Sequence, residues 1–282
     1  MTRSPDPEEP TVGYGIGRFL DMRSMRHRDD SVSSWVTPRP SLAGSDGGVR
    51  LGITTYLTDV ATGISSGLPV AGRGEWVVTT DLSVTLTSPV TVGPMRIDAR
   101  AVRIGATTVI ASFDIIDESL DADGYGGAGA KIVGGGTSTS RPFAVQFSEE
   151  IMRFPVGELL SHDGFAEPPN HSLLEEVGGQ IHRTGASATV TIELTDRLRN
   201  PWGILHGGVT ASLVDLAVEA LLPDQRPVSI TLRYVAPGRT GPIVATAVPG
   251  SRGGESGRRV RVEIVDVGNE GRLIGIADVV VV

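Results

Sequence analysis

Hydrophobic residues follow two different periods along the C-terminal part of the chain. Between about residues 207 and 222 nearly every position is apolar, which predicts a long buried helix. The segments on either side alternate apolar and polar residues with a period of two, which is typical of half-buried strands. The predicted strands cover residues 187–194, 228–235, 243–248, 258–265 and 273–281. One helix among mostly antiparallel strands predicts an α+β fold in which the sheet wraps around its helix.

The same order of elements occurs twice in the sequence. With Asp59 aligned to Asp215, residues 50–61 match residues 206–217 without a gap. The identical pairs are Gly52/Gly208, Thr54/Thr210, Leu57/Leu213, Asp59/Asp215 and Ala61/Ala217. Two later blocks match in the same order, residues 82–89 with 230–237 and residues 113–117 with 262–266. Three matched blocks indicate an internal duplication.

The duplication divides the 282 residues into two domains of ordinary size. We expect a flexible tail at 1–30 with one short helix near 15–23, a first domain at 31–141, a linker at 142–186 with a helix at 148–160, and a second domain at 187–282. The alignment offset falls from 156 at the helix to 148 at the next strand, so the first domain has a connection eight residues longer. A glycine-rich segment at 124–129 lacks the flanking strand and helix of a dinucleotide-binding loop, so we expect a plain loop.

Composition excludes several classes of function. The formal net charge is −8 and the 25 lysines and arginines are scattered singly, so we expect no nucleic-acid partner. There is no cysteine, and the five histidines do not cluster with acids at metal-ligand spacing. The N-terminus lacks the apolar core of a secretory signal, and no apolar run reaches the roughly 18 residues of a membrane span. The sequence therefore predicts a soluble, cytoplasmic protein with no metal and no membrane partner.

Candidate chemistry gathers at the start of the second predicted helix. His206-Gly207-Gly208 opens this helix, and the N–H of Gly207 at the positive helix end could stabilise an oxyanion. Asn200 lies seven residues before Gly207 and could direct its amide to the same carbonyl or to an attacking water. Asp215 lies in the apolar part of the same helix, where a buried acid is a candidate for function.

At these positions the chain resembles a known family. The residues that carry the resemblance are Asn200, Gly203, His206, Gly207, Gly208 and Asp215, the strand ending in Tyr-Val-Ala-Pro at 234–237, and the segment 257–267. They resemble the hotdog-fold acyl-CoA thioesterases of the phenylacetate-pathway (PaaI-like) type over about residues 187–282. Residues 31–141 look like a diverged copy, so the whole chain is similar to tandem double-hotdog thioesterases.

The resemblance implies a fold, a substrate and contacts to it. It implies one continuous sheet with two antiparallel central helices, and sites where these helices face each other. It also implies an acyl-CoA substrate, so coenzyme A belongs to the substrate and no separate cofactor is expected. Its expected contacts are Gly208, Arg258 and Arg259, although the two arginines fit a solvated strand edge equally well. A tandem pair supplies one hotdog dimer by itself, and assembly into a homo-oligomer stays open.

The length of the helix decides which acid could serve Gly207. From Gly207 to Asp215 is about 12 Å along a helix, so one thioester carbon cannot contact both. The acid is therefore expected from the first domain. Asp59 is the only charged residue between Arg50 and Arg73, and a lone buried carboxyl is expected to have a raised pKa and to act as base or nucleophile.

By the same pseudo-symmetry, Asp215 would face the start of the first helix. There Arg50-Leu51 replaces His-Gly, and no asparagine stands six residues before Arg50. We therefore expect one working site and one degenerate site. Asp59 and Asp215 could instead be structural acids bonded across the helix pair, and His206 could be only a helix cap.

One departure from the family concerns a hydroxyl group. Related enzymes often carry serine or threonine at the start of the strand that leads to Tyr234, where this chain has Arg226-Pro227-Val228. The hydroxyl could come from the first domain, and the candidates are Thr79, Thr80 and Ser83.

Three functions follow from these residues, in decreasing order of support. The first is hydrolysis of an acyl-CoA or acyl-carrier-protein thioester. The second is non-catalytic binding of an acyl-CoA or acyl chain by degenerate sites. The third is a hotdog hydratase, which would need a histidine and an acid converging on a substrate carbon, a spacing that is not visible here.

Overall fold

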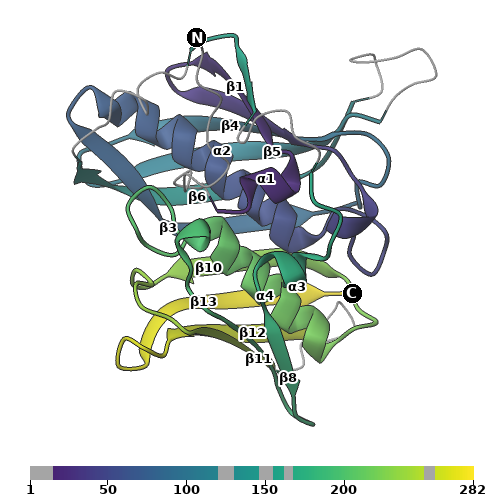
Figure 1. Cartoon of the computed structure of the whole chain (residues 1–282). Coiled ribbons are helices and arrows are strands. Elements are labelled where there is room, and N and C mark those ends of the chain that lie inside the picture. Colours follow the sequence, from purple (N-terminus) through teal and green to yellow (C-terminus); the bar gives the residue numbers. More distant parts are fainter. Residues whose placement is uncertain (1–14, 120–129, 146–154, 162–167, 251–257) are drawn as a thin grey trace, which may run out of the picture.

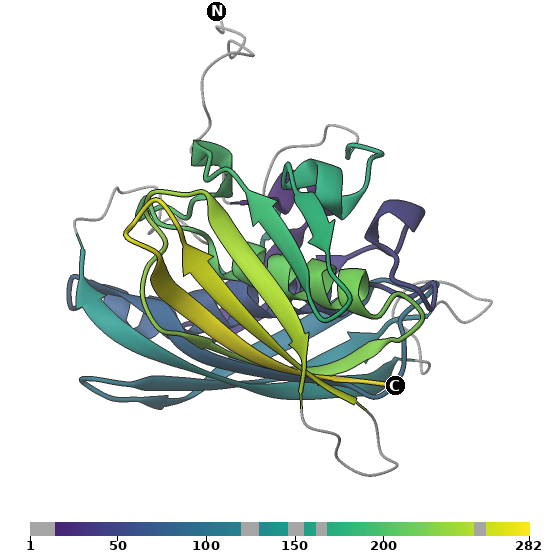
Figure 2. The same ribbon diagram turned by 90° about the horizontal axis from the view of Figure 1, so that it is seen from below.

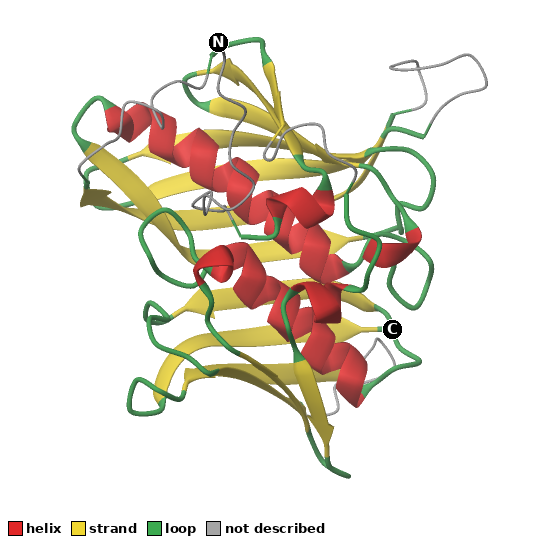
Figure 3. Ribbon diagram, in the orientation of Figure 1, coloured by secondary structure: helices red, strands yellow, loops and turns green. Residues whose placement is uncertain are grey.

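A computed structural model describes residues 15–119, 130–145, 155–161, 168–250 and 258–282. Within these residues a sheet of 13 strands carries two long helices on one face, α2 (Leu51–Ala71) and α4 (Gly207–Leu221) (Figures 1 and 3). Every pair of neighbouring strands in this sheet is antiparallel. The sheet curves beneath the helices, as Figure 2 shows. The predicted α+β architecture is confirmed at this level.

The two halves of the chain contribute strands in the same order. The first half supplies β1 (Arg23–Arg28), β2 (Ser31–Val36), β3 (Glu75–Leu86), β4 (Met95–Ile104), β5 (Val109–Asp117), β6 (Lys131–Ala144) and β7 (Leu159–Ser161). The second half supplies β8 (Gln180–Arg183), β9 (Ala188–Ile192), β10 (Pro227–Tyr234), β11 (Ile243–Pro249), β12 (Arg258–Asp266) and β13 (Arg272–Val281). Counted outward from the central pair, the order is β3-β6-β5-β4-β2 on one side and β10-β13-β12-β11-β9 on the other. The halves therefore share one topology, as an internal duplication predicts.

The elements predicted for the second half are confirmed. The apolar run at 207–222 forms α4, and each of the five alternating segments forms a strand whose ends lie within about two residues of the prediction. Their inward-facing positions are apolar and buried, as in β11, where Ile243, Ala245 and Ala247 are fully inaccessible. Hydrophobic period was a sufficient guide here because one face of each strand packs on α4.

The predicted N-terminal tail is wrong for its second part. Residues 17–20 form the short helix α1 (Gly17–Leu20), which the sequence placed near 15–23, and β1 follows it and pairs with β2. Phe19 and Leu20 of α1 are fully buried in the main core. A short segment of this kind has no periodicity of its own, so its place in the fold comes from tertiary burial. Residues 1–14 lie outside the described residues.

The helix predicted at 148–160 is wrong at its C-terminal end. Leu159–Ser161 form β7, which pairs with β1 at the edge of the sheet, so strand pairing has overridden the local helical pattern. The remainder of that predicted helix, 148–154, and the glycine-rich segment 124–129 lie outside the described residues. The described part of the linker has a different helix, α3 (Leu173–Glu176), which begins with a capping box between Ser172 and Glu175.

The extra residues of the first copy lie in regular structure rather than in a loop. Helix α2 has 21 residues and α4 has 15, while β3 has 12 residues and β10 has 8. The expected longer connection is thus an extension of α2 past the point where α4 ends, together with an earlier start of β3.

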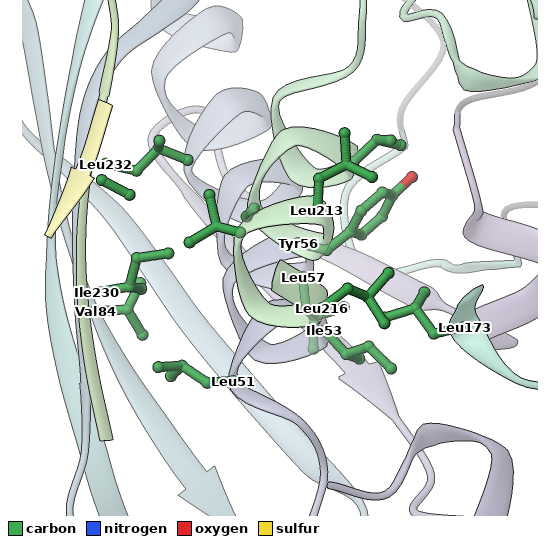
Figure 4. Packing of buried hydrophobic residues seen from close by; sticks show 14 of the residues in the cluster. Leu51, Ile53, Tyr56, Leu57, Val84, Leu173, Leu213, Leu216, Ile230 and Leu232 are labelled. Carbon is green, nitrogen blue, oxygen red and sulfur yellow. The ribbon is translucent and has the colours of Figure 1, made fainter. Parts of the chain in front are cut away.

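Helices α2 and α4 lie antiparallel and very close together. A Cβ atom added at Gly208 would lie 2.4 Å from the Tyr56 ring, and one added at Gly52 would lie 2.5 Å from Cβ of Asp215. The start of each helix therefore packs against the middle of the other, at a separation that only glycine permits. Figure 4 shows Val84, Ile230 and Leu232 pointing from the sheet to the helices, with Leu173 of α3 covering their other side. The helices are thus buried on both sides, and none of the described helices is long and apolar enough to cross a membrane.

Candidate active site

A large cavity lies where α2 and β3 meet the start of α4. Its volume is about 760 Å³. Residues of both halves line it, from α2, β3, β6, the loop before α4, and the segment 234–239, which begins at the last residue of β10. A cavity of this size is large enough for a small-molecule substrate. The candidate residues Asp59, Asn200, His206 and Gly207 all line it, whereas Asp215 does not.

Asp59 lies against the first turn of α4, as the length argument predicted. A Cβ atom added at Gly207 would lie 2.7 Å from Oδ2 of Asp59. Oδ1 accepts a hydrogen bond of 2.9 Å from the hydroxyl of Thr79, and the backbone N–H of Gly208 also points its positive end towards the carboxyl group. Burial raises the pKa of Asp59 from 3.8 to about 6, while the hydroxyl of Thr79 and the N–H of Gly208 favour the charged form and limit the rise.

Gly207 brings a backbone N–H to the cavity wall. Its N–H is the first of α4, so the helix has no carbonyl one turn below to accept from it. The missing side chain is also what allows the Asp59 carboxylate to approach the helix start. An N–H at the positive helix end beside a buried carboxylate can bind the oxygen of a polarised carbonyl group.

His206 is the N-cap of α4. Its Nδ1 accepts from the N–H of Gly208 at 3.0 Å, so its ring proton is assigned to Nε2. The ring stacks on Tyr56 with centroids 4.8 Å apart. Burial lowers the pKa of His206 to about 4, which keeps the imidazole neutral at pH 7. The 3.7 Å separation between Nδ1 and Asp59 is therefore neither an ion pair nor a hydrogen bond. His206 therefore acts as the helix cap that the sequence offered as its structural role.

Asn200 holds the loop that leads into α4. Its Oδ1 accepts from the N–H groups of Trp202 at 3.0 Å and Ile204 at 3.3 Å. Because the oxygen is occupied by the loop, the side-chain NH₂ group is the donor left for the cavity that Asn200 lines.

Two further residues of the cavity complete this arrangement. Tyr234 donates its O–H to the carbonyl of Gly207 at 3.0 Å and so fixes the peptide whose N–H belongs to Gly208. Burial, with a contribution from Asp59, raises the pKa of Tyr234 well above 10, so the hydroxyl keeps its proton. The sequence pointed to Tyr234 only as part of a strand end, and its spacing gave no signal of this contact. Thr79 was one of three candidate hydroxyls, and it is the one that contacts Asp59. Ser83 bonds instead to Thr231, away from the cavity.

The position beside Asp215, which corresponds to the Asp59 site in the other repeat, is occupied by the side chain of Arg50. Nε of Arg50 lies 2.8 Å from Asp215, and the other end of the guanidinium lies 2.6 Å from Glu219. Burial would lower the pKa of Arg50, but the two carboxylates raise it above its usual value, so Arg50 stays charged. The remaining cavity is only about 20 Å³, against about 760 Å³ on the other side. Asp215 therefore has an ionic partner and no room for a substrate beside it.

Arg258 and Arg259 are not among the residues that line the large cavity. They begin β12 as exposed residues, and Arg258 pairs with Val281, which also pairs with Pro227 beside the small cavity. They therefore lie towards the opposite end of the helix pair from Gly207. The sequence could not show this, because it does not tell which end of a strand faces a cavity.

Two other arginines, Arg141 and Arg239, lie at the edge of the large cavity, and both are exposed. The loop that carries Arg239 is held by Asp266, whose carboxylate accepts the N–H groups of residues 239, 240 and 241 at 2.7–3.0 Å. Among the described residues, no group of three or more histidine and acidic side chains could hold a metal ion.

Sequence comparison gives one match. Residues 196–280 match the model of a family described as acyl-CoA thioesterase N-terminal domain. These residues include the second helix, the candidate residues Asn200, His206 and Gly207, and the four strands that follow. No curated protein matches the chain.

Solved structures match along most of the chain. An acyl-ACP thioesterase from Bacteroides thetaiotaomicron is 14% identical with a TM-score of 0.57, and the match covers 90% of this chain and 98% of that one. The 12:0-ACP thioesterase from Umbellularia californica is 11% identical with a TM-score of 0.59, covering 89% and 94%. A tesB protein from Mycobacterium avium subsp. paratuberculosis is 10% identical with a TM-score of 0.58, covering 95% and 98%. The chain has the fold of these thioesterases. At such low identities the likeness concerns the fold alone.

Proposed function

We propose that the protein is a thioesterase that hydrolyses an acyl-CoA or acyl-carrier-protein thioester to the free acid and the thiol. The observation that carries the proposal is the contact of the buried Asp59 carboxylate with the glycine start of α4, inside a cavity of about 760 Å³. The family match of residues 196–280 and the fold of the thioesterase neighbours support it. We further propose that the chain is a tandem double-hotdog protein of the PaaI-like type, on the duplication and the His206-Gly207-Gly208 motif.

In the proposed reaction the thioester carbonyl oxygen receives the N–H of Gly207, with the amide of Asn200 as a second donor. Asp59 takes a proton from a water molecule, whose oxygen attacks the carbonyl carbon. The tetrahedral intermediate then expels the thiolate, which recovers the proton from Asp59. Alternatively, the carboxylate itself attacks the carbonyl carbon, the C–S bond breaks and the thiolate leaves, and water then hydrolyses the mixed anhydride and supplies the proton of the thiol. A single turnover in ¹⁸O-labelled water that gives unlabelled acid, with the label in Asp59, identifies the second route with water attacking the aspartyl carbonyl of the anhydride.

The test of the proposal is hydrolysis of a panel of acyl-CoA and acyl-carrier-protein thioesters, with release of free thiol as the readout. We expect turnover well above the uncatalysed rate for at least one substrate. No turnover with any of them, together with measurable affinity for acyl-CoA, would favour the non-catalytic binding protein.

The pKa of Asp59 makes a prediction about pH. Only the ionised carboxylate can act as base or nucleophile, so kcat/KM is expected to rise with pH and to reach half its plateau near pH 6. Replacing Thr79 with valine removes a hydrogen bond that favours the charged form, so the midpoint of the profile should move to higher pH. Thr80→Val is the matched control, because its hydroxyl bonds to the carbonyl of Thr139 instead. An unshifted profile in Thr79→Val would contradict the role of Asp59.

A further inference from the structure

The residues by which the first repeat exceeds the second build one end of the large cavity. Leu68 lies in the part of α2 that has no counterpart in α4, and Trp76 lies in the extra first residues of β3. Both line the cavity. Trp76 can lie flat on α2 because Gly67 has no side chain, since a Cβ atom there would be 2.6 Å from the indole ring. The length difference between the repeats thus supplies a wall that the second repeat does not have.

The other walls of this end are apolar and aromatic. Phe143 meets Trp202 edge-to-face with ring centroids 5.4 Å apart, and Trp202 lies 6.5 Å from Trp76. Gly63 and Ile64 of α2 line the same space. No atom lies within 4 Å of a Cβ added at Gly63, so the helix surface is open to the cavity at this point. The end of the cavity beyond Asp59 is therefore a groove along α2 that suits a hydrocarbon group.

The length of the groove indicates which hydrocarbon group would fill it. Asp59, Gly63 and Leu68 follow one another along α2, and nine residues of helix extend over about 13–14 Å. An extended hydrocarbon chain with C–C bonds of about 1.5 Å advances about 1.3 Å per carbon, so about ten carbons cover this length, and about eight to ten fit once the chain end keeps van der Waals distance from Leu68. A phenyl ring on a short linker is much shorter and would leave the far end empty.

We propose that the first repeat's extension makes the protein selective for linear, medium-length acyl chains of about eight to ten carbons, with Gly63 and Leu68 setting the length. This inference rests on the proposed thioesterase function, because it assumes that Asp59 marks the position of the reacting carbonyl. It assigns the groove to the acyl group and leaves the opposite side of Asp59, at Tyr234–Arg239, to the thiol carrier.

The test compares acyl-CoA substrates of two to sixteen carbons and phenylacetyl-CoA in wild type and three variants. Wild type should have its highest kcat/KM near eight to ten carbons. Gly63→Leu fills the groove about 6 Å from Asp59, so kcat/KM should fall at least tenfold for decanoyl-CoA and stay within about threefold for butyryl-CoA. Leu68→Ala lengthens the groove and should move the optimum to longer chains. Gly72→Leu is the matched control, because Gly72 caps the C-terminus of α2 and a side chain there also enters open space but outside the cavity, so its profile should equal that of wild type.

Three results would overturn the inference. The first is a wild-type preference for phenylacetyl-CoA or acetyl-CoA over decanoyl-CoA. The second is an equal loss for all chain lengths in Gly63→Leu, which would mean that the groove holds the thiol carrier, with the exposed Arg141 at its edge. The third concerns binding, which separates this inference from the proposed function. If no thioester is hydrolysed, the proposed thioesterase function fails and the groove is tested by binding alone. Quenching of Trp76 and Trp202 fluorescence then measures the affinity for decanoyl-CoA. Binding that is weakened at least tenfold in Gly63→Leu supports the groove, and unchanged binding overturns it.

Discussion

Replacing Asp59 with asparagine is expected to lower kcat/KM for a thioester by about 10²- to 10⁴-fold and, at the same time, to raise the melting temperature. Activity falls because asparagine cannot accept the proton of water or attack the carbonyl. Stability rises because Asp59 has a folded-state pKa of about 6 against an ordinary value of 3.8, so above pH 6 the fold carries a buried charge that the unfolded chain solvates. The difference corresponds to at most about 3 kcal/mol.

The pH dependence of this gain has a definite sign. Below about pH 3.8 the carboxyl group is protonated in both states, so asparagine and aspartic acid should be equally stable there. As pH rises through the interval from 3.8 to about 6, the wild type loses stability relative to Asp59→Asn, and above it the gap is constant. Thermal melts from pH 4 to 8 measure this. Asparagine keeps an oxygen that can accept from Thr79, so the local bonding is preserved.

Asp215→Asn is the matched comparison for activity. Asp215 lies beside Arg50 rather than in the large cavity, so its replacement should leave kcat/KM within about threefold of wild type for the folded protein. If Asp59→Asn kept full activity while Asp215→Asn lost it, the assignment of the acid to the first repeat would be reversed.

Replacing Arg50 with methionine is expected to destabilise the fold by about 3–5 kcal/mol with little change in kcat. The guanidinium is the partner of two carboxylates, and Asp215 is only 5% exposed. Without Arg50 the Asp215 charge would be buried and unpaired, which costs far more than the pair itself contributes. Denaturant unfolding measures the loss, and kcat is measured at a temperature where the variant is folded. A large fall in kcat would mean that the second position also takes part in the reaction.

A double variant controls for packing. Arg50→Met combined with Asp215→Asn removes the unpaired charge, so it should recover at least half of the lost stability. If the double variant is as unstable as Arg50→Met alone, the loss comes from the packing of Arg50 and not from the charge of Asp215.

Two parts of the structure could be predicted from the sequence. They are the helix and strands with one regular buried face, and the pairing of Asp59 with Gly207. The apolar run of α4 and the alternation of its strands needed no tertiary information. The juxtaposition of Asp59 and Gly207 followed from the rise of a helix and from the repeat. The family resemblance suggested Arg258 and Arg259 as ligand contacts, but both lie at the end of β12 that is far from Gly207. The strand pairing register that places them there cannot be predicted from local sequence.

The misplaced segments have a common physical cause. Residues 15–30 and β7 take their structure from burial against distant parts of the chain, which leaves no periodic signal in so few residues. The role of Tyr234 was hidden for a similar reason. Its contact with Gly207 joins residues 27 positions apart, and nothing in the strand pattern distinguishes that tyrosine from a core residue.

The continuous sheet with its paired helices has a further consequence for how the molecule can change. In a homodimer of identical subunits every mutation occurs twice, so a substitution that improves one active site alters its twin as well. Here both halves belong to one chain, and each position can vary alone. The start of α2 has Arg50, which forms an ion pair with Asp215 of the other half, while the start of α4 has Gly207. Two repeats in one chain can thus meet two demands with different residues, the cohesion of the halves and the proposed catalysis, whereas a symmetric pair must meet both with the same residues.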